Sequence, residues 1–124
     1  MNLLDSNIII YSAQPEYAYL RSLIFDKNSA VSKITQLEVL GFHRLNTSEK
    51  EYFTACFHFL KCYEISDSII NHAIALRQQR KRSLGDAIIA ATALHFNATV
   101  LTRNVEDFLD ISGINVLNPI KIGD

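Results

Sequence analysis

The sequence predicts an α/β fold with three layers, in which helices cover both faces of a mostly parallel sheet of about five strands. Short apolar runs of strand length alternate with longer segments of helical apolar spacing along the chain. The 124 residues, 48% of them hydrophobic, have the size of one domain and can bury a core of their own. No repeat, low-complexity stretch or linker divides them. Residues 1–124 are therefore expected to form a single domain.

The expected elements alternate in order along the chain. Strands are expected where apolar, partly β-branched runs are bounded by polar residues: Asn2–Leu4, Ala30–Ser32, Tyr63–Ile65, Thr99–Thr102 and Asn115–Leu117. Helices are expected where apolar residues recur at helical spacing: 7–13, 35–45, 48–61, 67–81, 84–97 and 104–110. Alternation of this kind indicates a parallel sheet. Because ligands of such sheets bind beyond the carboxyl ends of the strands, residues that follow a strand are the first candidates for a site.

Acidic residues stand at several of these positions, after a strand or at the start of a helix: Asp5, Glu38, Asp86 and Asp107. In three cases a residue suited to cap a helix precedes the acid by three positions: Thr35, Ser83 and Asn104. A cap with an acid in the first turn is common, because the acid meets the positive end of the helix dipole. Ser48 and Glu51 make the same pattern where no strand precedes them. Capping alone therefore remains an alternative to a chemical role.

The four acids would lie on one rim of a parallel sheet. Carboxylates gathered in this way repel one another, so they either hold protons through raised pKa values or recruit divalent cations. Oxygen ligands alone suit Mg²⁺ or Mn²⁺, and no His stands beside any of these acids in the sequence, which disfavours zinc. Metal held by carboxylates can polarise a phosphodiester and lower the pKa of a bound water. Phosphoryl chemistry is therefore the favoured interpretation.

Four motifs together resemble the PIN domain, and more closely the VapC-like toxin nucleases of type II toxin–antitoxin pairs. The motifs are D-S-N at 5–7, T-x-x-E at 35–38, L-G-D-A-I-I-A-A-T-A at 84–93 and T-R-N-x-x-D-F at 102–108. The resemblance implies a three-layer PIN fold and a metal-dependent endoribonuclease with Mg²⁺ or Mn²⁺ as cofactor. It implies Asp5, Glu38 and Asp86 as the acidic triad and Asp107 as the fourth acid. Three further positions match residues that support such a site: Ser6, Thr102 and Asn104.

The same resemblance implies two protein partners: a cognate antitoxin and a second copy of the chain in a homodimer. Apolar surface around Ile8–Tyr11 and Ile34–Leu45 could receive the antitoxin, and its Arg or Lys could enter the acidic rim. The aromatic stretch 52–63 cannot turn all its rings to one helix face, so part of it could belong to a subunit interface. Cys56 and Cys62 have no partner motif and are expected to be reduced thiols.

A basic cluster, R-Q-Q-R-K-R, ends the helix expected at 67–81 and stands just before the Asp86 motif. Its cations are Arg77, Arg80, Lys81 and Arg82. Cations are ordinary at the carboxyl end of a helix, where they meet its dipole. Their place beside the acids also suits contact with RNA phosphates. The formal net charge of −1 provides no general attraction for nucleic acid, so any binding to RNA depends on such a local patch.

Other functions fit the sequence less well. A phosphatase or phospho-accepting receiver domain would want D-x-D spacing after the first strand or a Lys after a late strand, and D-S-N and T-R-N offer neither. A housekeeping PIN nuclease of RNA processing remains an alternative, as does a non-catalytic PIN interaction module. The module would be expected to lack an acid of the triad. With no signal-peptide pattern and no apolar run near the ~20 residues of a membrane span, a cytoplasmic protein is expected.

Overall fold

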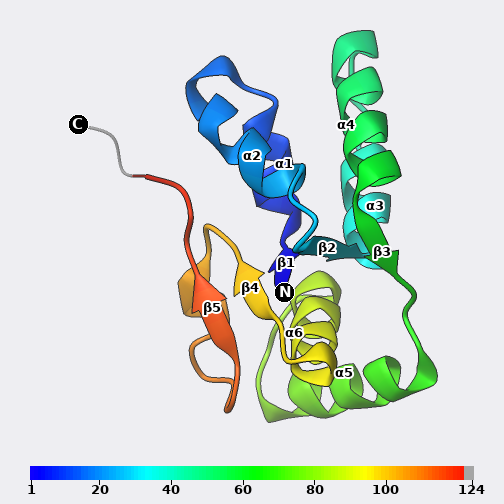
Figure 1. The fold of residues 1–124 in the computed structure, drawn as a ribbon. Helices are drawn as coiled ribbons and strands as arrows, with labels where there is room; N and C mark the ends of the chain where they lie inside the picture. The colour runs from blue at the N-terminus through cyan, green and yellow to red at the C-terminus, as the bar shows by residue number, and fades with distance from the viewer. Residues whose placement is uncertain (122–124) are drawn as a thin grey trace.

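The computed structural model describes residues 1–121 and contains a five-stranded sheet with the order β3-β2-β1-β4-β5 (Figure 1). Every neighbouring pair is parallel. The strands are β1 Asn2–Leu4, β2 Ser29–Ser32, β3 Lys61–Tyr63, β4 Thr99–Leu101 and β5 Asn115–Leu117. The predicted fold class is confirmed. The third strand was predicted at Tyr63–Ile65 and begins two residues earlier.

Helices cover both faces of the sheet. Their bounds are α1 Ser6–Ser12, η1 Pro15–Leu20, α2 Arg21–Ile24, α3 Lys33–Leu40, α4 Thr47–Phe59, α5 Asp67–Gln79, α6 Leu84–Phe96 and η2 Val105–Asp107, where η marks 3₁₀ helix. Neighbouring strand residues point to opposite faces, so Leu3 packs into a core with α5 and α6, whereas Leu4 packs with α1, α3 and α4. The inner strands β2, β1 and β4 are thus buried on both sides, as the strands of parallel sheets usually are.

The structure differs from the prediction mainly in its short helices. The helix expected at 104–110 is only η2, and the one expected at 35–45 ends at Leu40. The helical segment formed by η1 and α2 was not predicted, because only four residues of α2 and a kinked 3₁₀ turn make it up, too few to show an apolar period. None of the helices within residues 1–121 has the length and apolar character that crossing a membrane requires.

Two of the expected helix caps were also wrong. Ser32, and not Thr35, caps α3, since its hydroxyl accepts a hydrogen bond from the amide of Ile34 at 3.2 Å. Asn46 caps α4 and exchanges two hydrogen bonds with Glu49, which shifts the capping box two residues upstream of Ser48 and Glu51. A Ser–x–x–acid spacing in the sequence cannot show which residue of a polar run is the N-cap, the last residue before the helix begins.

Candidate active site

Asp5 lies at the carboxyl end of the central strand β1 and is 6% exposed. Its Oδ1 accepts a hydrogen bond from the amide of Ser6 at 2.8 Å and so starts α1. Its Oδ2 accepts one from the Thr102 hydroxyl at 2.8 Å and a longer one from the Asn7 side chain at 3.3 Å. Thr102 directly follows β4, the neighbour of β1. Chain segments almost a hundred residues apart thus hold this one carboxylate in place.

Glu38 comes from α3 and meets the site through two contacts. The Ser6 hydroxyl donates a hydrogen bond to Glu38 Oε1 at 2.8 Å. The other carboxylate oxygen lies against Gly85 in the first turn of α6, where an added Cβ would stand only 2.9 Å from it. Because Gly85 has no side chain, a carboxylate can approach the amino end of this helix, where the helix dipole favours negative charge.

Asp86 and Asp107 complete the acidic group. Asp86 follows Gly85, is half-buried, and its amide donates to the capping hydroxyl of Ser83 at 3.0 Å. Burial raises the pKa of the Asp86 carboxyl, and the negative charges of Asp5 and Asp107 raise that pKa further. Burial likewise raises the pKa of Asp5; hydrogen bonds from Thr102 and Ser6 oppose this effect, and the Glu38 charge adds to it. The four acids therefore form one electrostatic group.

Helix capping does not account for all four acids. Asp5 and Asp86 do stand at helix starts, so for them a structural and a chemical role coexist. Thr35 does not cap α3, and among residues 1–121 its buried hydroxyl lacks a hydrogen-bond partner. The exposed side chain of Asn104 forms no capping bond to η2 within the described chain. Capping thus fails as an explanation for the positions of Glu38 and Asp107.

Two residues of the candidate site, Asn7 and Gly85, were not predicted from the sequence. Asn7 donates through its side-chain amide to Asp5 and Thr102, both at 3.3 Å, and accepts from the amide of Arg103 at 3.1 Å. It belongs to the D-S-N motif, so a signal was present, but its role depends on a contact across the sheet. Gly85 belongs to the L-G-D motif in the same way. Thr102 also accepts from the amide of Asn104 at 3.1 Å and so shapes the start of the segment that carries Asp107.

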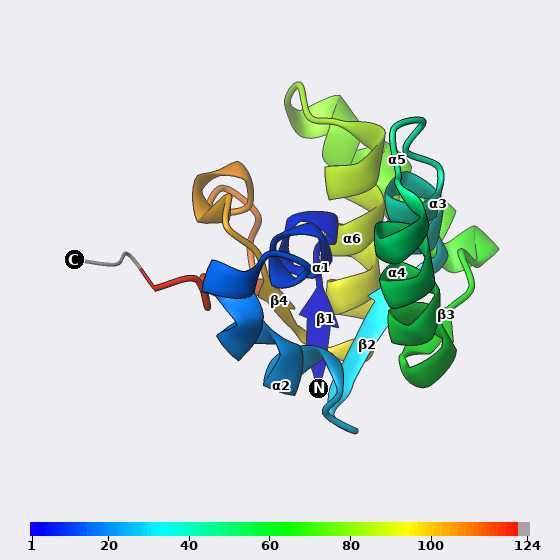
Figure 2. The same cartoon turned by 90° about the horizontal axis from the view of Figure 1, so that it is seen from above.

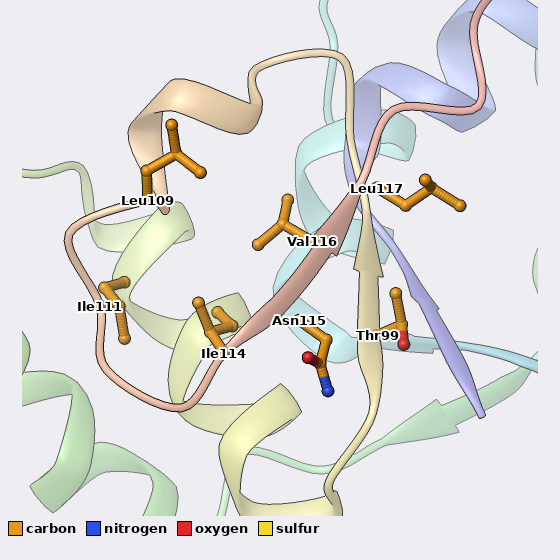
Figure 3. Close-up of a pocket in the computed structure, with 7 residues that line it drawn as sticks. All are labelled: Thr99, Leu109, Ile111, Ile114, Asn115, Val116 and Leu117. Carbon is orange, nitrogen blue, oxygen red and sulfur yellow. The ribbon is translucent and has the colours of Figure 1, made fainter.

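A groove of about 440 Å³ opens beside Asp86 and Asp107. Its lining combines these two acids and Ser83 with the basic cluster Arg77, Arg80, Lys81 and Arg82. A larger groove of about 550 Å³ lies along the edge strand β5 and is lined by Thr99, Leu109, Ile111, Ile114, Asn115, Val116 and Leu117 (Figure 3). Its lining is mostly apolar and includes none of the acids, so the smaller groove is the one that belongs to the candidate site.

Arg82 differs from the other three cations of the groove. Its side chain is only 2% exposed, and its Nη2 pairs with Asp110 Oδ2 at 2.7 Å. Its Nε donates to the carbonyl oxygen of Leu76 at the end of α5 at 2.9 Å. The expectation that Arg82 contacts phosphate therefore needs correction, because the protein itself occupies its guanidinium. Arg77, Arg80 and Lys81 are exposed.

The donor atoms of the site fit a divalent cation. They are carboxylate and hydroxyl oxygens, the ligands that Mg²⁺ and Mn²⁺ prefer. A cation among them would relieve the repulsion that raises the pKa of Asp86. No three His, Cys, Asp or Glu side chains among residues 1–121 are arranged as they stand to hold an ion. Asp5 and Asp107 follow strands whereas Glu38 and Asp86 come from helices, and these side chains would have to turn toward an ion to enclose it.

The family model of the PIN domain matches residues 3–114. The chain belongs to the PIN domain family. The resemblance inferred from the motifs is thereby confirmed. PIN proteins are nucleases that generally use divalent metal ions, which agrees with the oxygen ligands described above.

Solved structures resemble this PIN domain over almost its whole length. A toxin–antitoxin complex from Klebsiella pneumoniae is 31% identical, with a TM-score of 0.78 and coverage of 98% of this chain and 100% of that chain. FitAcB from Neisseria gonorrhoeae is 26% identical, with a TM-score of 0.76 and coverage of 96% and 98%. VapBC2 from Rickettsia felis, bound to a DNA fragment from its promoter, is 22% identical with a TM-score of 0.76 over 94% and 97%, and shows the common fold alone. No curated protein sequence matches at a significant level.

Proposed function

We propose that this PIN domain is a metal-dependent endoribonuclease that acts as the toxin of a toxin–antitoxin pair. The observation that carries the proposal is that four carboxylates influence one another's charge beside a groove with exposed cations: Asp5, Glu38, Asp86 and Asp107. The likeness to the toxin–antitoxin complex from Klebsiella pneumoniae over 98% of the chain supports it. A housekeeping nuclease of RNA processing would share the chemistry but would need no antitoxin.

Mg²⁺ or Mn²⁺ would bind to four carboxylates: Asp5, Glu38, Asp86 and Asp107. When bound, such an ion polarises the phosphodiester and makes a water molecule a better nucleophile. Other side chains set the ligands in place. The Thr102 hydroxyl and the Asn7 amide hold Asp5, and the Ser6 hydroxyl holds Glu38. Asn104 is exposed next to this network and stays a candidate for supporting the site.

The RNA backbone would enter along the groove. Arg77, Arg80 and Lys81 line it and are exposed, so they can meet phosphate oxygens while Asp86 and Asp107 face the reacting phosphodiester. Arg80 also pairs with Asp110 at 3.1 Å, but its side chain remains 46% exposed. Arg82 is left out of the RNA contacts because it is buried.

An antitoxin would use apolar surface between α1, α3 and α4. A small cavity of about 140 Å³ lies there, lined by Ile10, Val39, Phe42, Leu45, Glu49 and Phe53. Ile10 and Phe42 are exposed although apolar, as expected of surface that a partner covers. This lies in the region that the sequence analysis assigned to the antitoxin. A basic side chain of the antitoxin that reaches the carboxylates could compete with metal, because a guanidinium pairs with carboxylate through two hydrogen bonds. We also propose a homodimer.

The chemistry is tested with Asp86→Asn. Wild-type protein should cut RNA with Mg²⁺ or Mn²⁺ and stop when EDTA is added. The variant should keep its circular dichroism spectrum but lose more than about 100-fold in rate, since even changes to residues that only support a metal ligand cost 10–100-fold. Glu51→Gln on the exposed face of α4 is the control acid and should leave the rate unchanged. Unchanged activity per folded Asp86→Asn molecule would reduce Asp86 to a capping residue.

The toxin role is tested in cells. Induced expression should arrest growth, and co-expression of the small protein encoded next to the gene should relieve the arrest and co-purify with this chain. Asp86→Asn should be harmless at the same level of expression. If a folded, metal-loaded wild-type chain cuts RNA in vitro but leaves growth unaffected, the housekeeping role replaces the toxin role. If it neither cuts RNA nor arrests growth, the non-catalytic module is favoured.

A further inference from the structure

Three tyrosines form a row that runs from the last turn of α1 into η1. Tyr11 and Tyr17 meet edge to face with ring centroids 4.9 Å apart, and Tyr17 lies 6.3 Å from Tyr19. Tyr11 belongs to α1 and the other two to η1. Tyr11 and Tyr17 are half-buried, and Tyr19 is 38% exposed. The rings are therefore a surface feature and not part of the two cores.

Two exposed cations accompany the row. The Arg103 guanidinium lies 5.2 Å from the centre of the Tyr11 ring and also bonds to its hydroxyl. Lys121 Nζ lies 5.4 Å from the centre of the Tyr19 ring, and the Lys121 amide donates to the Tyr19 hydroxyl at 2.9 Å. We call Tyr11, Tyr17, Tyr19, Arg103 and Lys121 the tyrosine row. Alternation of rings with cations is typical of surfaces that bind single-stranded nucleic acid.

The tyrosine row is continuous with the acidic site. Arg103 directly follows Thr102, whose hydroxyl binds Asp5, and the Arg103 amide donates to Asn7, which also binds Asp5. Figure 2 shows α1 between the connection from α5 to α6, which carries Arg80, Lys81 and Arg82, and the η1–α2 segment, which carries Tyr17 and Tyr19. The basic cluster thus lies beside Asp86, and Arg103 lies beside Asn7, which binds Asp5.

We propose that the tyrosine row binds nucleotides of single-stranded RNA on the side of the acids opposite the basic groove. The inference rests on the proposed nuclease function and names a second surface that would hold its substrate. Exposed ring surface can stack with unpaired bases, while Arg103 and Lys121 can meet the adjoining phosphates. Duplex RNA cannot bind in this way, because its bases already stack on one another. A single strand that contacts both cationic surfaces passes over the carboxylates between them.

Binding is measured by fluorescence anisotropy with a labelled single-stranded RNA, in an Asp86→Asn background that prevents cleavage. The double change Tyr17→Leu and Tyr19→Leu should weaken binding about tenfold or more, because each stacked base contributes about five- to 150-fold. Tyr17→Phe with Tyr19→Phe keeps the rings and should stay within about twofold of the background. Phe25→Leu removes an exposed ring outside the row and is the matched control. Binding of duplex RNA should be unaffected by all of these changes.

Salt dependence separates the row from the basic groove. Arg77→Gln with Lys81→Gln should flatten the dependence of RNA binding on salt by about 0.7 slope units per lost phosphate contact. Tyr17→Leu with Tyr19→Leu, called the Tyr→Leu pair below, should weaken binding and leave this slope unchanged. Arg103→Gln with Lys121→Gln tests the row without altering its rings and should flatten the slope. Equal single-strand binding by the Tyr→Leu pair and its background, with wild-type thermal stability, overturns the inference.

Two further outcomes distinguish the inference from the function on which it rests. If the wild-type protein cuts RNA and the Tyr→Leu pair in the wild-type background cuts and binds it equally well, only the inference fails. If the wild-type protein shows no metal-dependent cleavage in the same preparation, the proposed function fails.

If the Tyr→Leu pair keeps RNA binding but no longer retains the neighbouring small protein, the row is a protein-docking surface, and the inference is likewise overturned.

Discussion

At the residue scale, the arrangement of the candidate site depends on Gly85, which has no side chain. Gly85 lets the Glu38 carboxylate lie against the first turn of α6, beside Asp86. Ser6 holds the other oxygen of the same carboxylate through its hydroxyl at 2.8 Å. A residue with a Cβ at position 85 would leave the backbone of α6 intact but would take the space of the carboxylate. Glu38 thus owes its position to contacts from two other helices.

Gly85→Ala should separate activity from stability. The new Cβ would stand 2.9 Å from Glu38 Oε2, so the flexible end of Glu38 must turn away at small cost to folding. Ala also favours helix over Gly by up to about 1 kcal/mol. The midpoint of thermal unfolding should therefore stay or rise, while the cleavage rate falls by about tenfold or more, as for other disturbances of metal-site geometry. Glu38→Gln is the comparison variant. A fully active Gly85→Ala protein would show that this position of Glu38 is not required.

At the scale of elements, an ion pair between the buried Arg82 and the exposed Asp110 joins the segment before α6 to the segment after β4. Arg82, at the end of the α5–α6 connection, binds the carbonyl oxygen of Leu76 and the carboxylate of Asp110. The Arg82 hydrogen bond is the main cause of the lowered pKa of Asp110. Because Asp86 and Asp107 each lie a few residues from this pair, it keeps their two segments side by side. A residue that was predicted to bind RNA is therefore a structural link.

Arg82 and Arg80 contact the same acid and should differ in their effect on folding. Arg82→Gln removes buried hydrogen bonds and should lower the free energy of unfolding by about 1–3 kcal/mol. Arg80→Gln removes a contact from a side chain that is 46% exposed and should cost less than about 1 kcal/mol. Urea unfolding measures both. Arg80→Gln should instead weaken RNA binding, and equal stability losses in the two variants would contradict the assignment of Arg82 as a structural residue.

At the scale of the whole molecule, the chain is nearly neutral but its charges are separated. The formal net charge is −1, yet the acids meet beyond the ends of β1 and β4 while exposed cations line the groove next to them. Parallel strands bring their carboxyl ends to one rim, so charged residues from distant parts of the sequence lie close enough to influence one another. The repulsion among the acids is a cost to the metal-free protein, and bound cations would remove it.

Asp86→Asn should stabilise the metal-free protein near pH 7. Because the pKa of Asp86 is raised in the folded state, the folded protein holds this proton more tightly than the unfolded chain. The group therefore costs no stability below its ordinary pKa of 3.8, and the cost develops as the pH rises through the raised folded pKa. The advantage of the variant should shrink as the pH falls towards 3.8. Thermal unfolding in EDTA across this range measures the difference.

In excess Mn²⁺ the wild-type protein should become more stable than Asp86→Asn, the reverse of the order expected in EDTA. The wild-type protein gains about 2.7 kcal/mol at a metal concentration 100 times its dissociation constant, whereas Asp86→Asn, with one ligand removed, gains less. If Asp86→Asn is less stable than wild type in EDTA at pH 7, the structural contribution of Asp86 at the start of α6 outweighs its repulsion with the other acids.

The sequence by itself determined the fold class and the five strands to within about two residues, because hydrophobic periodicity is a property of consecutive residues. Its motifs also predicted the four acids, whose role in a site stays a prediction. Only the tertiary structure decided which residues share a site. It brought Asn7 to Thr102 and Glu38 to Gly85, gave the caps to Ser32 and Asn46, and buried Arg82 against Asp110. Each of these contacts and caps depends on which of several nearby polar groups forms a hydrogen bond in the folded chain. That choice is made by packing across the sheet and between helices, which the spacing of residues in one segment does not contain.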